Sequence, residues 1–143
     1  MQIALNESKK ALEKDEVPIG AIIVLDGEII AKAHNMKEQW LDPTAHAEIV
    51  AIRAACTRLN RWRLAGTTMY VTMEPCPMCA GAIVQSRIDR LVYGVKDPKA
   101  GAVDSLFNIT QNDALNHQLQ VTSGVLAEEC RDIVKSFFQR RRS

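Results

Sequence analysis

Two short clusters of metal-ligating residue types stand out in the chain, His46-Ala47-Glu48 and Pro75-Cys76-Pro77-Met78-Cys79. Residues three apart on a helix share a face, so the thiolates of Cys76 and Cys79 can reach one ion. The positive end of the helix dipole lowers thiol pKa values, which favours the thiolates that zinc needs. One imidazole and two thiolates suit zinc, so we predict that His46, Cys76 and Cys79 hold one Zn²⁺ per chain.

The number of ligands distinguishes a catalytic zinc from a structural one. A structural site uses four protein ligands, whereas a catalytic site has three and an open position. Cys56 is the nearest spare thiol in sequence, but on a helix shared with His46 it would lie roughly 15 Å away. Cys130, His34 and His117 are not excluded in this way, although none lies in a ligand-like doublet. Three ligands and a water molecule are therefore the preferred interpretation.

Glu48 is the predicted proton shuttle. Two thiolates and a neutral histidine cancel the charge of zinc, so the ion should acidify water less than a three-histidine site would. A carboxylate beside that water could take its proton and later pass it to the substrate. Residues two apart on an ideal helix point in nearly opposite directions. The role therefore requires His46 and Glu48 to lie at the first turn of a helix.

Each of these residues also has a plainer interpretation. A Cys-Pro-x-Cys helix start suits a disulfide-exchange pair as well, and the zinc could be purely structural. Glu48 could be a first-turn acid that the helix dipole favours. Cys56 and Cys130 lie on apolar helical stripes and are predicted to be core residues. His34 is interpreted as structural.

Bulk properties favour one folded domain, residues 1–143. Hydrophobic residues make up 47% of the chain, which is typical of a globular protein. A net charge of +1 does not call for a nucleic-acid partner, although a local basic patch could bind one. No apolar run approaches the roughly 20 residues of a membrane span, and no signal pattern opens the chain. We therefore expect a cytoplasmic protein whose four cysteines form no disulfide framework.

Helices and strands alternate around the two clusters, which predicts an α/β layered domain. Strands are expected at 20–25, 28–33, 67–72, 91–93 and 120–122. Helices are expected before Pro18, after Thr44, from Pro75 to Pro77 onward, and over 126–141. Asp26-Gly27 supplies a hairpin turn between the first two strands. The stretch 95–118 shows no clear pattern of a helix or a strand, and a long loop there would be a functional feature.

The helix that follows Asp42-Pro43-Thr44 carries the first cluster. Thr44 is a plausible residue to cap its start. One apolar stripe is expected to face the sheet, and it consists of Ile49, Ile52, Cys56 and Leu59.

Longer blocks around both clusters closely resemble the bacterial tRNA-specific adenosine deaminases. The cluster signature alone specifies only the zinc deaminase superfamily, which includes cytosine, guanine and cytidine deaminases. The resemblance covers nearly the whole chain from about Lys14 onward, but residues 108–114 depart from the pattern and the N-terminus is shorter. The blocks that carry it are Glu16-Val17-Pro18-Ile19-Gly20-Ala21, Asp42-Pro43-Thr44-Ala45-His46-Ala47-Glu48, Glu74 through Ala82, Ser86-Arg87-Ile88 and Phe137-Phe138-Gln139-Arg140-Arg141-Arg142.

The resemblance implies a three-layer α/β/α sandwich with a central mixed five-stranded sheet, and a homodimer. It also implies hydrolytic deamination of the wobble adenosine to inosine in a tRNA anticodon loop. Zinc-activated water would attack C6 of adenine, while Glu48 protonates the N1 nitrogen and then helps ammonia leave. A loop base costs least to extrude into such a pocket.

The resemblance further implies contacts with RNA. Asn35 and Ala47 would bind the flipped-out nucleoside, and Asn116 and His117 would hold neighbouring anticodon nucleotides. Arg140 and Arg141 would meet loop phosphates and bases, and their charge would add salt-dependent affinity without base specificity. Asn35 could instead simply form a turn, and arginine runs at a chain end are usually solvated.

Two other functions stay open at this point. The first is a free-base or nucleoside deaminase that acts on guanine or cytosine. The second is a non-catalytic, zinc-stabilised RNA-binding module.

Protein purified without chelators should contain about one zinc ion per chain, because an NS₂ site of this kind binds zinc tightly. Elemental analysis against protein concentration measures this ratio. A content far below one would contradict both the enzyme and the zinc-stabilised module.

Overall fold

A tight hairpin opens the sheet. In the computed structural model, which describes residues 1–142, β1 (Gly20–Leu25) and β2 (Glu28–His34) pair antiparallel. Asp26 and Gly27 connect them with positive φ angles of 50° and 78°. A two-residue hairpin turn needs such angles, and an Asp-Gly pair adopts them readily. The predicted turn and both predicted strands are confirmed.

The remaining strands extend the hairpin into a mixed sheet of order β2-β1-β3-β4-β5. The strands are β3 (Thr67–Met73), β4 (Arg90–Val95) and β5 (Gln120–Thr122). β1 pairs antiparallel with β3, whereas β3 with β4 and β4 with β5 are parallel. The carboxyl ends of β3 and β4 therefore lie at the same edge of the sheet, where α4 begins.

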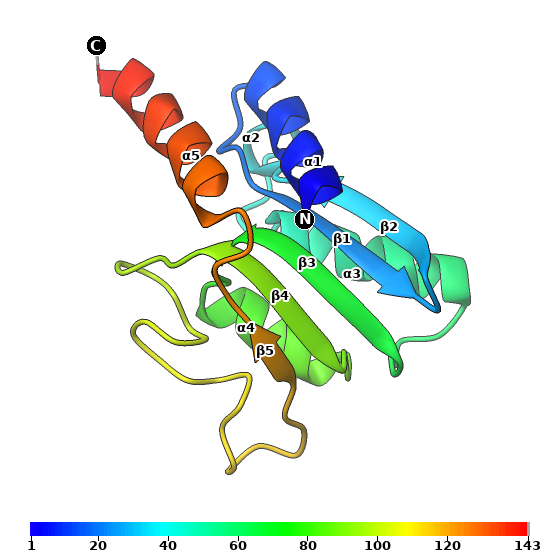
Figure 1. Cartoon of the computed structure of the whole chain (residues 1–143). Coiled ribbons are helices and arrows are strands. Elements are labelled where there is room, and N and C mark those ends of the chain that lie inside the picture. The colour runs from blue at the N-terminus through cyan, green and yellow to red at the C-terminus, as the bar shows by residue number, and fades with distance from the viewer. Residues whose placement is uncertain (143) are drawn as a thin grey trace.

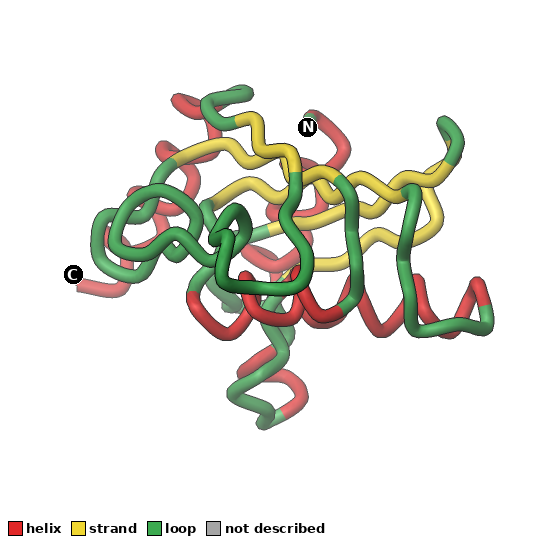
Figure 2. Tube along the Cα trace, turned by 90° about the horizontal axis from the view of Figure 1, so that it is seen from below, coloured by secondary structure: helices red, strands yellow, loops and turns green. Residues whose placement is uncertain are grey.

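Helices cover both faces of the sheet (Figure 1). α1 (Gln2–Glu13) and α5 (Ala127–Arg142) lie on one face, and α3 (Ala47–Leu59) and α4 (Pro77–Gln85) lie on the other. Figure 2 shows the strands as the middle layer. This is the predicted three-layer α/β/α sandwich. Among the described helices, none has both the length and the apolar composition that crossing a membrane requires.

Two predictions about the segment between β2 and α3 were wrong. A short helix, α2 (Lys37–Trp40), lies where only a polar stretch was expected. Thr44 does not cap α3, which begins at Ala47. The N–H and the hydroxyl of Thr44 both donate to the Asp42 carboxylate, at 2.8 and 2.7 Å, so Thr44 belongs to the turn before the helix.

The face of α3 that packs on the sheet also differs from the predicted stripe. Its fully buried residues include Ala47, Ala51 and Ala55, whereas the predicted stripe is only partly buried. Small side chains let the helix backbone approach the sheet closely. Hydrophobicity patterns weight large apolar residues, so they missed this alanine face.

The stretch 95–118, for which the sequence predicted neither helix nor strand, is a long loop after Val95, because no helix or strand occurs between β4 and β5 in the described chain. It runs beside α4 and β5 in Figure 1. On the opposite face, α1 contacts the backbone of β1 at Gly20. A Cβ atom there would lie 2.0 Å from the Ala4 carbonyl oxygen and 2.6 Å from the Ser8 nitrogen. Only glycine fits between this helix and strand.

Gly20→Ala should lower the free energy of unfolding by about 3 kcal/mol, because the new methyl group meets backbone atoms that cannot move aside cheaply. Urea unfolding followed by circular dichroism measures the change. Gly81→Ala is the matched control, since nothing lies within 4 Å of its added Cβ. That variant should gain roughly 0.5–1 kcal/mol, as alanine does over glycine in a helix. Equal stabilities for the two variants would contradict this packing.

Candidate metal centre and active site

The start of α3 brings His46 and Glu48 to one place. His46 flanks the helix in an extended conformation, with φ −71° and ψ 153°, and Glu48 is the second helical residue. The side-chain oxygen of Asn35, at the end of β2, accepts the N–H of Ala47 at 2.7 Å. On an ideal helix, residues two apart point in nearly opposite directions. His46 lies before the first helical residue, so this restriction does not apply to it, and its side chain can lie on the same side as that of Glu48. The proton-shuttle role of Glu48 requires this arrangement.

The start of α4 supplies the two thiols. Pro77 is the first helical residue, and Cys76 flanks it in an extended conformation with φ −73° and ψ 173°. Proline is favoured at this position because its missing N–H would have no partner within the helix. Cys79 lies in the first turn and is buried. Both sulfurs therefore lie at the positive end of the α4 dipole.

The three predicted ligand atoms meet in space. The Nδ1 atom of His46 lies 3.6 Å from the sulfur of Cys76 and 3.5 Å from the sulfur of Cys79. All three atoms lie within 4.8 Å of one another. Tetrahedral zinc, with bonds of about 2.3 Å to sulfur and 2.05 Å to nitrogen, would hold such atoms about 3.6 Å apart. The donor set and its spacing therefore fit this ion.

The thiols are electrostatically coupled. The hydrogen bond from Cys79 lowers the pKa of Cys76 to about 4, with burial opposing it and His46 adding to it. The same contact, together with burial, raises the pKa of Cys79. Contact with Cys76 raises the pKa of His46. A divalent cation at this point would favour the thiolate form of both sulfurs and would displace the proton of the hydrogen bond between Cys79 and Cys76.

Glu48 is a buried carboxyl group beside the cluster, with 4% of its surface exposed. Burial raises its pKa to about 7, and this effect exceeds the lowering by its own backbone N–H and by His46. Contact with the Cys79 thiol places the carboxyl group next to the ligand atoms. A group whose pKa lies near neutrality can both accept and donate a proton, as general acid–base catalysis requires.

In the described chain, no fourth His, Cys, Asp or Glu joins the ligand atoms. All four cysteines are free thiols, and Cys130 is buried in the core as predicted, whereas Cys56 is only partly buried. The ring of His34 lies 3.2 Å from the carboxylate of Glu7, and that of His117 bonds elsewhere. The three-ligand interpretation therefore agrees with the structure.

The predicted substrate-contact residues are not all near the ligand atoms. Asn35 and Ala47 adjoin them, but their mutual hydrogen bond already uses the Asn35 oxygen and the Ala47 N–H. The Nε2 atom of His117 lies 2.7 Å from the carbonyl oxygen of Ile88, and Asn116 is exposed. Ile88 follows the far end of α4, about 13 Å along the helix from Cys76. Substrate contacts by these residues stay predictions.

The basic tail is anchored to the end of α1. Arg141 donates to the carbonyl oxygen of Asp15 at 2.8 Å, and its guanidinium group lies 4.8 Å from the centre of the Phe137 ring. Arg140 and Arg141 line a hollow of about 200 Å³ between α1 and α5. Their contact with RNA also stays a prediction. The side chain of Arg142, and Ser143, lie outside the described residues.

Sequence patterns gave no role to Glu74, although it lies two residues before Cys76. Its carboxylate is buried and accepts several hydrogen bonds from the loop after β4. Burial would raise the pKa of Glu74, but these bonds outweigh it and hold the pKa below its usual value. An acidic residue at the end of a buried strand is the one signal that could have marked it.

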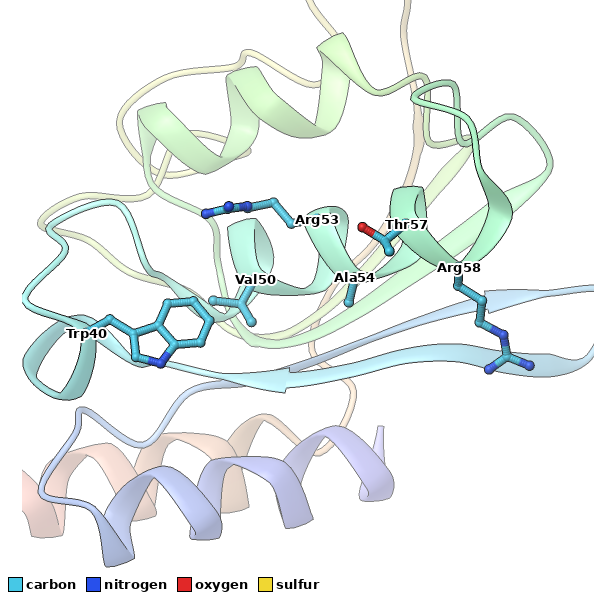
Figure 3. A pocket seen from close by; sticks show the side chains of 6 residues that line it. All are labelled: Trp40, Val50, Arg53, Ala54, Thr57 and Arg58. Carbon is cyan, nitrogen blue, oxygen red and sulfur yellow. The ribbon is translucent and has the colours of Figure 1, made fainter.

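A groove on the surface is separate from the ligand atoms. It measures about 520 Å³ and lies along the outer side of α3, beside α2 (Figure 3). Its lining residues are Trp40, Val50, Arg53, Ala54, Thr57 and Arg58. None of these is a predicted ligand or proton shuttle, so the chemistry of the site does not reside there.

The fold and the three-ligand cluster define a deaminase domain, and residues 1–142 match the MafB19-like deaminase family. The chain is 53% identical over 142 residues to a tRNA-specific adenosine deaminase of Bacillus subtilis, covering 99% of this chain and 88% of that protein. The chain therefore belongs to the family of tRNA-specific adenosine deaminases.

Solved structures agree with this membership. One comes from biochemical and structural studies of adenosine-to-inosine editing by tRNA deaminases at the wobble position of transfer RNA. It is 49% identical with a TM-score of 0.90, covering 93% of this chain and 96% of that one. A guanine deaminase from Bacillus subtilis is 31% identical with a TM-score of 0.65, covering 99% and 90%. The predicted family and fold are thus confirmed.

Asn35→Ala should lower the free energy of unfolding by about 1–3 kcal/mol, because the buried N–H of Ala47 then has no acceptor. Thermal or urea unfolding measures the loss. Asn35→Asp keeps an acceptor at the same reach, at the positive end of α3, and should recover most of the stability. An alanine variant as stable as the parent would contradict a capping role for this residue.

Proposed function

We propose that this protein hydrolyses the wobble adenosine of a tRNA anticodon loop to inosine and ammonia. The observation that supports it most is the buried Glu48 beside three ligand atoms at zinc spacing, in a chain of this family. The relatives named above support adenosine in tRNA as the substrate. The residues of the site support hydrolytic deamination as the reaction.

His46, Cys76 and Cys79 would hold zinc through one nitrogen and two sulfurs. A zinc ion bound there would lower the pKa of a water molecule at its open coordination position. Cys76 and Cys79 contribute two negative charges, which limit that effect. The chain must therefore provide its own base for the proton.

Glu48 would be that base. Its buried carboxyl group accepts the proton of the attacking water as the bond from oxygen to C6 of adenine forms. It then donates this proton to the N1 nitrogen of the ring. It takes the remaining proton of the new hydroxyl group and passes it to the amino nitrogen as the C6–N bond breaks, so that ammonia leaves. A pKa near 7 suits both directions of transfer.

The RNA contacts follow from the same proposal. The side-chain oxygen of Asn35 already accepts the Ala47 N–H, so its amide nitrogen would be the donor that meets the extruded nucleoside. Asn116 and His117 would hold neighbouring nucleotides, and Arg140 and Arg141 would bind phosphates of the loop. Extruding a base from its stack costs free energy, and this cost is smallest for a base in a loop.

Guanine is the strongest alternative substrate, because the guanine deaminase named above shares 31% identity and the same fold. That protein acts on a free base. The two substrates are separated by incubating the protein with tRNA and with guanine or cytosine in parallel.

We also propose, from the family, a homodimer in the cytoplasm, where its tRNA substrate would be encountered. Sedimentation at several protein concentrations tests the assembly. A mass that equals 15.9 kDa at all of them would contradict the dimer.

Glu48→Gln should reduce inosine formation in a tRNA pool by about 10²–10⁴-fold, because the amide has the same size but cannot accept the proton. Sequencing the treated tRNA measures inosine at each anticodon. The zinc content should not change, because Glu48 is not a ligand.

Glu28→Gln is the matched control, since this carboxylate is exposed and pairs with Arg58 among the described residues. It should leave inosine formation at the level of the parent. Turnover of guanine or cytosine without inosine in tRNA would contradict the proposed substrate. Unchanged activity in Glu48→Gln would contradict the proposed base.

A further inference from the structure

Glu74 ties the loop after β4 to the segment that carries Cys76. Glu74 is 3% exposed, so nearly all of its contacts are with protein atoms. The hydroxyl of Ser105 donates to one of its oxygens. Four backbone N–H groups also donate to it, those of Asp97 at 3.0 Å, Val103 at 3.1 Å, Asp104 at 2.8 Å and Ser105 at 2.9 Å.

The loop also approaches this segment through its backbone. The N–H of Ala102 donates to the carbonyl oxygen of Pro75 at 2.8 Å. At Gly101, a Cβ atom would lie only 2.4 Å from the carboxyl carbon of Glu74. The loop is therefore attached to both residues that precede Cys76, and no side chain fits between them at Gly101.

Five donors exceed the roughly four lone-pair sites of one carboxylate, so its acceptor capacity is filled. They replace water around a buried charge, so the carboxylate has no need of a cation as partner. Such a fully bonded group has one preferred position. Because a peptide plane is rigid, fixing Glu74 and Pro75 also fixes where the backbone of Cys76 begins.

We propose that Glu74 is a positioning residue of the metal centre, which sets the position of the Cys76 sulfur by locking residues 97–105 onto Glu74 and Pro75. The inference rests on the proposed zinc site and deepens it. Glu74 acts through Cys76, because its carboxylate bonds to the loop and to no ligand atom. Residues that orient metal ligands commonly contribute 10–100-fold to metal affinity.

Glu74→Gln tests the proposal with little change in volume. The amide retains one acceptor oxygen, and its NH₂ group faces N–H donors that it cannot satisfy. Zinc affinity, measured by competition with a chromophoric chelator, should fall by about 10–100-fold. With Co²⁺ in place of zinc, the thiolate-to-cobalt absorption band should shift, because it reports the sulfur geometry directly.

Ser105→Ala is a milder variant that keeps the charge and the four N–H donors. It should fold normally and lose roughly two- to fivefold in zinc affinity, as the loss of one hydrogen bond allows. If Glu74→Gln gives no folded protein, Ser105→Ala decides the question alone.

Val134→Ala controls for general loss of stability. Val134 is buried on α5, on the face of the sheet opposite α3 and α4. Its truncation should lower the melting temperature but leave the zinc affinity and the cobalt spectrum unchanged. The proposal is overturned if Glu74→Gln, or Ser105→Ala where that variant decides alone, behaves like Val134→Ala in both measurements. Failure of the parent protein to bind zinc would overturn the proposed function instead.

Discussion

The metal centre depends on two helix starts being held side by side. Its ligand atoms come from positions 46, 76 and 79, yet they lie within 4.8 Å of one another. Neither helix start could ensure this alone. The start of α3 is bonded to the end of β2 through Asn35, and α4 follows directly from β3. β1 pairs with β2 on one side and with β3 on the other, so the sheet fixes the two helix starts relative to each other.

Local signals in the sequence predicted much of this arrangement. The Asp26-Gly27 turn, the proline at the start of α4 and the spacing of Cys76 and Cys79 each depend on neighbours along the chain. That His46 joins the two cysteines was predicted from the ligand types that zinc prefers. Contacts that cross the fold were not predictable in this way. The bond from Asn35 joins residues twelve positions apart, and that from Glu74 to Val103 joins residues 29 apart. The start of α3 was misplaced for the same reason, because a tertiary acceptor replaces the local cap.

Two buried glutamates near the metal centre show how environment decides the role of one residue type. Glu74 is surrounded by donors, which hold its pKa low and keep it charged and immobile. Glu48 has few donors, so burial raises its pKa to about 7. The first is suited to fixing the backbone and the second to moving a proton. The same carboxyl group would thus have a low pKa among the donors around Glu74 and a raised pKa in the surroundings of Glu48.

The long connection between β4 and β5 is bonded to Glu74, just after β3, and has no helix or strand in the described chain. Residues 111–116 of this connection are exposed, so insertions there would meet solvent and would leave the ligand atoms and the proton carrier undisturbed. The ligand atoms and the proton carrier thus belong to other elements than this exposed stretch. Natural selection can change the stretch while conserving those elements, which is consistent with the same fold occurring in a guanine deaminase.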